Sequence, residues 1–269
     1  MSHPITSLEA FVRAHMSAND AISLYLEANK ANYQPLDMET QQQLDRRSAV
    51  FMHANNAYSR IALVKTVLEQ TADLLDPATQ QSPIFMVSVA PAHFAVELEA
   101  ANGFDVERVR RWTKRALESR DALSIVEAAL YTNANVAGHP ARMVSWHSHS
   151  PVWNRTRKQL DAQLKPLRNR HTSFVPGIEA VHVADVSASA VEKAIYICKA
   201  PLKEYRLIRR ESVNQETGEV IQRFDQKKRD MRTGDRVRMC KVMSDHYLNN
   251  LLFGTGKEVL FAAELPTTF

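Results

Sequence analysis

The sequence predicts an α+β fold in which an antiparallel sheet, with helices on one face, follows an N-terminal α-helical hairpin. Apolar residues recur at helical spacing within residues 6–75, whereas from Ile84 onward short apolar segments alternate with amphipathic ones. The 269 residues are 45% hydrophobic and 24% charged, and they include only seven glycines. This composition excludes a disordered or collagen-like chain and is typical of a helix-rich globular protein.

Residues 1–80 are predicted to be a helical extension. Thr6 and Glu9 have the spacing of a capping box, which predicts a helix from there to about Asn29. A second, longer helix is expected over residues 37–75, where the apolar positions broadly keep helical spacing. The two helices form the predicted hairpin, and nothing in them suggests chemistry.

Residues 81–200 are predicted to form the core domain, with elements in the order β-α-β-β-α-β-α. Strands are expected at Ile84–Val89, Leu123–Thr132, Arg142–His149 and Ile178–Val186, and helices at Asp105–Arg120, Arg155–Leu167 and Ser187–Lys199. Alanines in the second strand leave a helix as an alternative there, and Asn154 is the expected cap of the second helix. Two right-handed β-α-β crossovers that share a central hairpin give the ferredoxin-like arrangement.

Residues 201–269 are predicted to form a basic region that packs on this core. The segments Tyr205–Glu211 and Glu219–Phe224 are expected to pair as a β-hairpin, and Arg236–Phe253 is expected to be helical.

The charge of the chain is concentrated in its second part. Residues 1–80 hold six Lys and Arg against nine Asp and Glu, a net of −3, which leaves +7 for residues 81–269 because the whole chain carries +4. Such clustering is typical of a protein that binds a polyanion, although solvated helix faces also produce it. The predicted nucleic-acid-binding residues are Arg155, Arg157, Lys158, Arg206, Arg209, Lys227 and Lys228.

Two short motifs contain side chains suited to chemistry. His147 and His149 stand two apart on a predicted strand, so both imidazoles point to one face, as two ligands of a divalent metal would. Tyr196 and Lys199 stand three apart on a predicted helix and share one of its faces. Alone, a histidine pair often arises by chance, and a tyrosine at a helix end is usually half-buried packing.

Placed in this order on the predicted elements, the motifs resemble those of the HUH endonucleases, the superfamily of rolling-circle replication initiators, conjugative relaxases and related transposases. The apolar segment Ile84–Val89 is similar to the first-strand motif of that family. The resemblance covers about residues 84–199 and implies that His147 and His149 bind a metal with a third ligand from the preceding strand. Glu127 is the expected third ligand, with Asn133 and His139 as alternatives.

The chain departs from the family pattern at three positions. Ser148 and Ser150 stand where the family has bulky apolar residues, and Ser88 is the only hydroxyl residue in the first strand, where threonines are frequent. These departures bear on metal affinity more than on the fold.

The resemblance implies a DNA-nicking reaction with Mg²⁺ or Mn²⁺ as cofactor. Tyr196 would attack a phosphate of single-stranded origin DNA and leave a 5′-phosphotyrosyl link, while Lys199 would steady the phosphate or orient the tyrosine. Tyr205 lies nine residues further on, so a mechanism with two tyrosines is not expected. The sequence has no phosphate-binding loop of the Gly-x-x-x-x-Gly-Lys-Ser/Thr type, so a helicase, like a polymerase, would come from the host.

The expectation is therefore a plasmid- or phage-type replication initiator. A relaxase or transposase would share the site, and two other classes remain open: a non-catalytic DNA- or RNA-binding protein and a helical adaptor. No apolar segment approaches the roughly 18 residues that span a bilayer, and residues 1–8 lack a basic region followed by an apolar one. Two cysteines exclude a disulfide framework, so a cytoplasmic protein without a membrane partner is expected.

Overall fold

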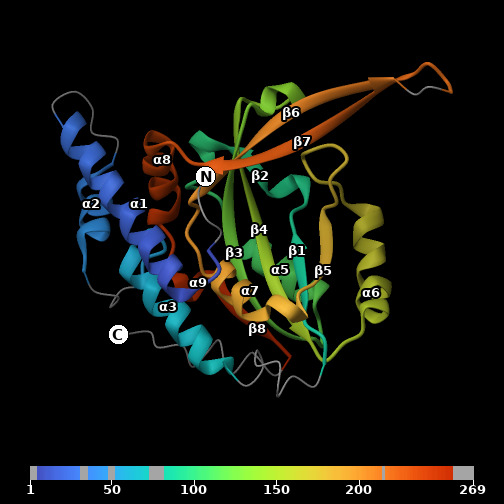
Figure 1. The fold of residues 1–269 in the computed structure, drawn as a ribbon, viewed down its shortest axis with the longest axis horizontal. Coiled ribbons are helices and arrows are strands. Elements are labelled where there is room, and N and C mark those ends of the chain that lie inside the picture. Colours follow the sequence, from blue (N-terminus) through green and yellow to red (C-terminus); the bar gives the residue numbers. More distant parts are fainter. Residues whose placement is uncertain (1–4, 31–35, 48–51, 73–81, 214–215, 257–269) are drawn as a thin grey trace.

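The computed structural model describes residues 5–30, 36–47, 52–72, 82–213 and 216–256, and within them the fold is α+β (Figure 1). Among these described residues, an eight-stranded mixed sheet is packed with eight α-helices. Its longest path has the strand order β5-β1-β4-β3-β6-β7. The strands of this path are β1 (Phe85–Val89), β3 (Asp121–Thr132), β4 (Arg142–Trp153), β5 (Val181–Asp185), β6 (Lys203–Val213) and β7 (Val220–Asp230).

The first four strands of this path, β5-β1-β4-β3, each run antiparallel to their neighbours within this group of four. The predicted strand over Leu123–Thr132 is confirmed as part of β3. Side chains on both of its faces are buried, which explains its almost continuous apolar sequence. β4 continues to Trp153 instead of ending at His149, and the left-handed backbone of Asn154 (φ 58°) then turns the chain. Asn154 therefore does not cap the next helix, α6 (Arg157–Arg170). Thr156 does, through a capping box with Gln159.

Helices cover both faces of the sheet, so the prediction of helices on one face is wrong. Helix α5 (Glu107–Ala116) contacts the face that carries Ser148, to which Thr113 is hydrogen-bonded at 2.7 Å. Helix α7 (Ala190–Ile197) is followed by Lys199, which contacts Glu127 on the opposite face. The sheet is also mixed instead of antiparallel throughout, because β6 runs parallel to β3.

The part of the N-terminal segment that the structure describes contains three helices instead of the predicted hairpin of two: α1 (Leu8–Asn29), α2 (Met38–Asp45) and α3 (Ala57–Gln70). The single helix expected over residues 37–75 is interrupted because Asn56 caps α3 by accepting from the Ser59 amide, and its own amide group donates to the carbonyls of Gln43 and Arg46. The expected end of that helix, residues 73–75, lies outside the described residues.

The C-terminal segment supplies the strands that pair with the free edge of β3. The predicted hairpin is confirmed as β6 and β7, which extend as a long ribbon beyond the rest of the molecule (Figure 1). The helix predicted over residues 236–253 is wrong at its end: α8 (Thr233–Ser244) and α9 (Leu248–Leu251) are followed by the strand β8 (Leu252–Thr255). β6 pairs with residues 130–132 of β3 and β8 with residues 122–125, so β8 satisfies backbone groups that β6 does not reach.

A shared hydrophobic core joins the three segments of the predicted division at residues 80 and 200. One cluster of buried side chains includes Phe11 and Val64 from the first segment, Trp146 from the second and Met243 from the third. A short strand, β2 (Ala95–Glu97), also pairs with β4. The segments therefore pack as neighbours around the central strands, and the division itself stays a prediction.

Candidate functional site

Three potential metal ligands lie on one face of the two central strands. Glu127 of β3 pairs in register with His147 of β4, and His149, two residues further along β4, points to the same side. The Nε2 atoms of the two histidines lie 3.2 Å apart, and Oε2 of Glu127 lies 3.9 Å from Nε2 of His147 and 3.6 Å from Nε2 of His149. The strand register thus brings together the two histidines and the expected third ligand.

This group could hold a metal ion. Two donors bound to one divalent ion at about 2.1 Å, and at angles between those of octahedral and tetrahedral coordination, lie about 3.0 to 3.5 Å apart. The three observed separations are within this range or slightly above it. Oε2 of Glu127 is buried and has no hydrogen-bond partner among the described residues, which costs free energy unless a cation compensates it. Distances and donor chemistry therefore both fit a cation.

Hydrogen bonds orient both imidazoles toward the common point. Nδ1 of His147 donates to the carbonyl of Ser145 at 3.0 Å, which leaves the lone pair of its Nε2 available. Nδ1 of His149 lies 2.8 Å from the hydroxyl of Ser88, which pairs in register with it across β1 and β4. The one hydroxyl residue of the first strand thus supports a candidate ligand.

The protonation states also suit cation binding. Burial lowers the pKa of His149 to about 3 and lowers the pKa of His147, so both imidazoles are neutral near pH 7. Burial alone would raise the pKa of Glu127, but the Lys199 ammonium beside it, together with the two histidines, holds that pKa below its usual value. Two lone pairs and one carboxylate therefore face each other.

Tyr196 lies next to this group, on the same face of the sheet. Its ring centroid is 5.7 Å from that of His149, and the Lys199 ammonium stands 4.0 Å from the centre of the Tyr196 ring. Lys199 also contacts Oε1 of Glu127. The helical spacing of Tyr196 and Lys199 thus places the tyrosine and the lysine beside the candidate ligands, with the ammonium between the carboxylate and the ring.

The base of the β6–β7 ribbon supplies neighbours of Tyr196 that the sequence reasoning missed. Nζ of Lys228 lies 3.5 Å from the Tyr196 hydroxyl, and Tyr205 is hydrogen-bonded to Tyr196. Tyr205 stacks on Tyr131 with ring centroids 5.1 Å apart, because the two residues pair in register between the parallel strands β6 and β3. Burial raises the pKa of all three phenols well above the usual value. The sequence could have indicated this cluster of tyrosines only if the parallel pairing of β3 with β6 had been predicted.

A basic cavity of about 390 Å³ opens beside Tyr196. Its lining includes one acidic residue, Glu192, and five basic residues: Lys193, Lys199, Lys203, Lys228 and Arg229. Burial and the neighbouring ammonium groups of Lys199, Lys203 and Lys193 lower the pKa of Lys228. The cavity therefore suits an anionic ligand that reaches the Tyr196 hydroxyl.

The alternative ligands lie away from this site. Asn133 donates to the carbonyl of Leu207, and Nε2 of His139 is hydrogen-bonded to the carbonyl of Phe174. Neither belongs to the group formed by Glu127, His147 and His149.

The predicted nucleic-acid-binding residues divide between two regions. Arg155, Arg157 and Lys158 lie at the start of α6, whose Leu160 and Leu164 pack with Val152 on the sheet face opposite the histidines. Arg206, Arg209 and Lys227 line a groove of about 460 Å³ at the base of the ribbon. Lys228 alone among these residues contacts Tyr196. Of the predicted nucleic-acid-binding residues, the structure thus places Lys228 beside the tyrosine, whereas Arg206 and Lys227 pair with each other one position further along the ribbon.

Ser148 and Ser150, the two departures beside the histidines, have buried hydroxyl partners. The Ser148 hydroxyl lies 2.7 Å from that of Thr113, and the Ser150 hydroxyl lies 2.7 Å from that of Ser124. Each serine therefore packs on the face opposite the histidines with its polar atom satisfied.

Comparison of the chain with protein-family models, with curated proteins and with solved structures finds no match in any of the three. Among the residues that the structure describes, none of the helices has the length and apolar character that crossing a membrane requires. The arguments for function therefore rest on the geometry of the site.

Proposed function

We propose that the protein is an HUH-type endonuclease that initiates DNA replication by nicking single-stranded DNA at an origin. The observation that carries this proposal is the position of Tyr196, which lies beside His149 on the same sheet face as three candidate metal ligands. A hydroxyl nucleophile, a cation site and a basic cavity are the parts that phosphoryl transfer requires.

The fold proposed to carry this site is the ferredoxin-like core of that superfamily. Its support is the strand order β5-β1-β4-β3 with all neighbours antiparallel and with α5 and α6 as the crossovers. The histidines lie on β4, an inner strand, and the tyrosine lies on the helix that follows β5.

The proposed metal is Mn²⁺ or Mg²⁺, held by Glu127, His147 and His149. Two imidazoles and one carboxylate suit Mn²⁺ better than Mg²⁺, which prefers oxygen ligands. When bound, the ion would act as a Lewis acid that polarises the scissile phosphate.

In the proposed reaction the Tyr196 oxygen forms a bond to phosphorus while the bond between phosphorus and the 3′ oxygen breaks. The phenolic proton leaves to solvent, and the departing 3′ oxygen takes up a proton and becomes a hydroxyl. Because burial raises the pKa of Tyr196, the phenolate needs nearby cations, and Lys228 at 3.5 Å from the hydroxyl supplies one. Lys199 above the ring supplies a second. The phosphotyrosyl bond conserves the energy needed for later resealing.

A non-catalytic nucleic-acid-binding protein is the second candidate, favoured by the basic groove of Arg206, Arg209 and Lys227, which binding alone would explain. A relaxase or a transposase would use the same site as the initiator, so these differ in biological role and not in chemistry.

The test incubates the protein with Mn²⁺ and a pool of random-sequence single-stranded oligonucleotides, and detects covalent protein–DNA adducts after denaturation. We expect an adduct with the wild type and with Tyr205→Phe, the matched control, and none with Tyr196→Phe. His147→Ala should lose the adduct as well. Binding of the pool without an adduct under any condition would reject the nuclease and favour the binding protein.

A further inference from the structure

The end of helix α7 is held by two side chains from the N-terminal helices. Arg60 of α3 donates from Nη1 to the carbonyls of Cys198 and Lys199, at 3.2 and 3.0 Å. His15 of α1 accepts a hydrogen bond from the Ala200 amide at 2.9 Å. The three bonded residues follow one another directly after Tyr196 and Ile197, and one of them is Lys199 itself.

Arg60 is placed at some energetic cost. It is 2% exposed, and its other hydrogen bond goes from Nε to the carbonyl of Ala54 at 2.9 Å, so its described partners are three backbone carbonyls and no carboxylate. Burial lowers its pKa to about 10, which still leaves it charged at neutral pH. Carbonyls beyond the last turn of a helix lack helical partners and carry partial negative charge, so they compensate a buried cation.

His15 acts as a fixed acceptor. Its Nδ1 donates to the carbonyl of Phe11 at 2.8 Å, and its ring stacks on that of Phe11 with centroids 3.9 Å apart. Burial lowers the pKa of His15 to about 3, so the ring is neutral and its Nε2 is a lone-pair acceptor for the Ala200 amide.

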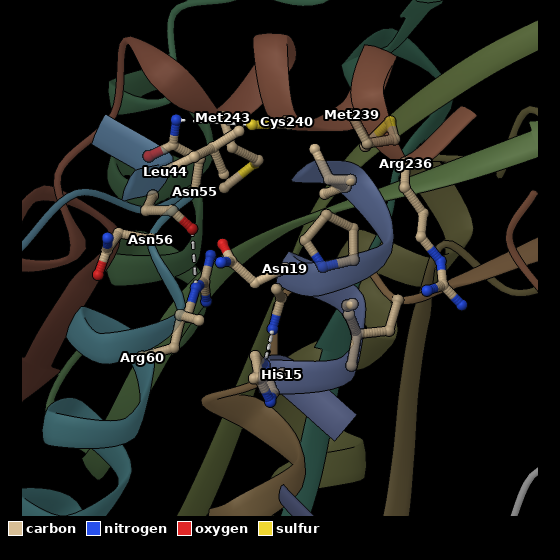
Figure 2. Close-up of a pocket in the computed structure, with 17 residues that line it drawn as sticks. His15, Asn19, Leu44, Asn55, Asn56, Arg60, Arg236, Met239, Cys240 and Met243 are labelled. Atoms are coloured by element: carbon tan, nitrogen blue, oxygen red, sulfur yellow. Dashed lines mark hydrogen bonds between the residues drawn. The ribbon is translucent and has the colours of Figure 1, made fainter. Parts of the chain in front are cut away.

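Both side chains line a small cavity between α1, α3 and α8 (Figure 2). Its volume of about 50 Å³ accommodates a few water molecules and no organic ligand. Arg60 and His15 therefore serve the end of α7 and not a ligand of their own.

We propose that Arg60 and His15 are positioning residues, through which the N-terminal helices set the placement of Tyr196 and Lys199 against Glu127 and His149. The consequence for catalysis rests on the proposed nicking function. Arg60 bonds the carbonyl of Lys199, whose ammonium contacts Glu127 and covers the Tyr196 ring. A displacement at this point therefore moves the nucleophile and its cation together, and displacements of about 1 Å can cost about 100-fold in rate.

The test compares Arg60→Met, Arg60→Lys and His15→Leu with the wild type. We expect Arg60→Met to slow adduct formation at saturating oligonucleotide by roughly 10- to 100-fold. The Kd values for the oligonucleotide and for Mn²⁺, measured by fluorescence anisotropy and electron paramagnetic resonance, should change less than about twofold. Arg60→Lys should recover part of the rate, because an ammonium can still donate to one or two of the carbonyls.

Leu164→Ala is the matched control for lost stability. Leu164 is fully buried in α6, on the other side of the sheet, so this variant should lower Tm with the adduct rate unchanged. Equal rate losses in Leu164→Ala and Arg60→Met would overturn the proposal, as would a wild-type rate in both Arg60→Met and His15→Leu. If Arg60→Met does not fold, the adduct rates of Arg60→Lys and His15→Leu test the proposal instead.

Hydrogen exchange separates this proposal from the nicking function. We expect the amides of residues 194–200 to exchange at least about tenfold faster in Arg60→Met and His15→Leu, while those of α6 keep their wild-type rates. A wild type that forms no adduct would reject the nuclease and leave this measurement to judge the positioning. Unchanged exchange over residues 194–200 would reject the positioning whether or not the wild type nicks DNA.

Discussion

The two faces of β4 differ in how their polar side chains are hydrogen-bonded. We call them the serine face, with Ser148 and Ser150, and the histidine face, with His147 and His149. On one face Ser148 and Ser150 are fully buried, and each hydroxyl has a partner hydroxyl at 2.7 Å. On the other face His147 and His149 converge on Oε2 of Glu127, which has no hydrogen-bond partner among the described residues. The hydroxyls of the serine face are paired with protein atoms, whereas the three ligand atoms of the histidine face could hold a cation between them. Ser148 and Ser150 thus serve packing, and His147 and His149, on the other side of the same strand, are the residues proposed to bind a metal ion.

The largest effect expected from this difference is the loss of metal binding. His147→Ala, His149→Ala and Glu127→Gln each remove one of three ligand atoms, and we expect each to weaken Mn²⁺ binding by at least about 100-fold. Electron paramagnetic resonance of free Mn²⁺ measures the Kd. Ser148→Ala, one residue away on the other face, is the control and should keep the wild-type Kd. Equal Kd values in the ligand variants and the control would show that the histidine face is packing too.

A smaller effect is expected from Ser88. Its hydroxyl is the partner of His149 Nδ1, so Ser88→Ala leaves the imidazole free to rotate and should weaken Mn²⁺ binding about 10- to 100-fold. Ser88→Thr keeps the hydroxyl and should bind Mn²⁺ nearly as well as the wild type. Equal weakening by both substitutions would assign the loss to packing instead of the hydrogen bond.

Lys199 tests the electrostatics of the histidine face. Its ammonium contacts Glu127 and repels an incoming cation, so Lys199→Met should tighten Mn²⁺ binding by about tenfold. The same variant should form adducts more slowly, because the cation over the Tyr196 ring is gone. Lys193→Met, farther from the ring at 5.8 Å, is the control, and equal tightening of the Kd in both variants would contradict this account.

The smallest effect belongs to the serine face. Ser148→Ala leaves the Thr113 hydroxyl buried without its partner and should lower the free energy of unfolding by about 1–2 kcal/mol, measured by urea denaturation. The double variant Ser148→Ala with Thr113→Val removes both hydroxyls and should recover most of that loss. Additive losses in the double variant would mean that the two hydroxyls do not act as a pair.

Much of the site could be predicted because its motifs are local. The spacing of His147 with His149, and of Tyr196 with Lys199, determines which side chains share a face of a strand or helix without any tertiary knowledge. Glu127 was predicted as well, although its alignment with His147 depends on a strand register that the sequence does not determine.

The missed residues all depend on contacts between distant segments. Tyr205 reaches Tyr196 only because β6 runs parallel to β3, and Arg60 reaches Lys199 only because α3 packs at the end of α7. The break between α2 and α3 left a local signal, since Asn56 stands three residues before Ser59 in the spacing of a helix cap. Because apolar residues keep helical spacing on both sides of Asn56, a single helix was predicted across this break.

The burial of the three candidate ligands has a consequence for the kinetics of metal exchange. Their side chains are only 8–14% exposed, so a multidentate chelator cannot surround an ion held between them until one of these side chains moves away. Release must then await a spontaneous opening of the site, and the rate of metal loss should level off as the chelator concentration rises. A site at an exposed sheet edge would lose its ion faster with each addition of chelator. Residence time, in addition to affinity, would then determine how long the protein stays loaded between encounters with DNA.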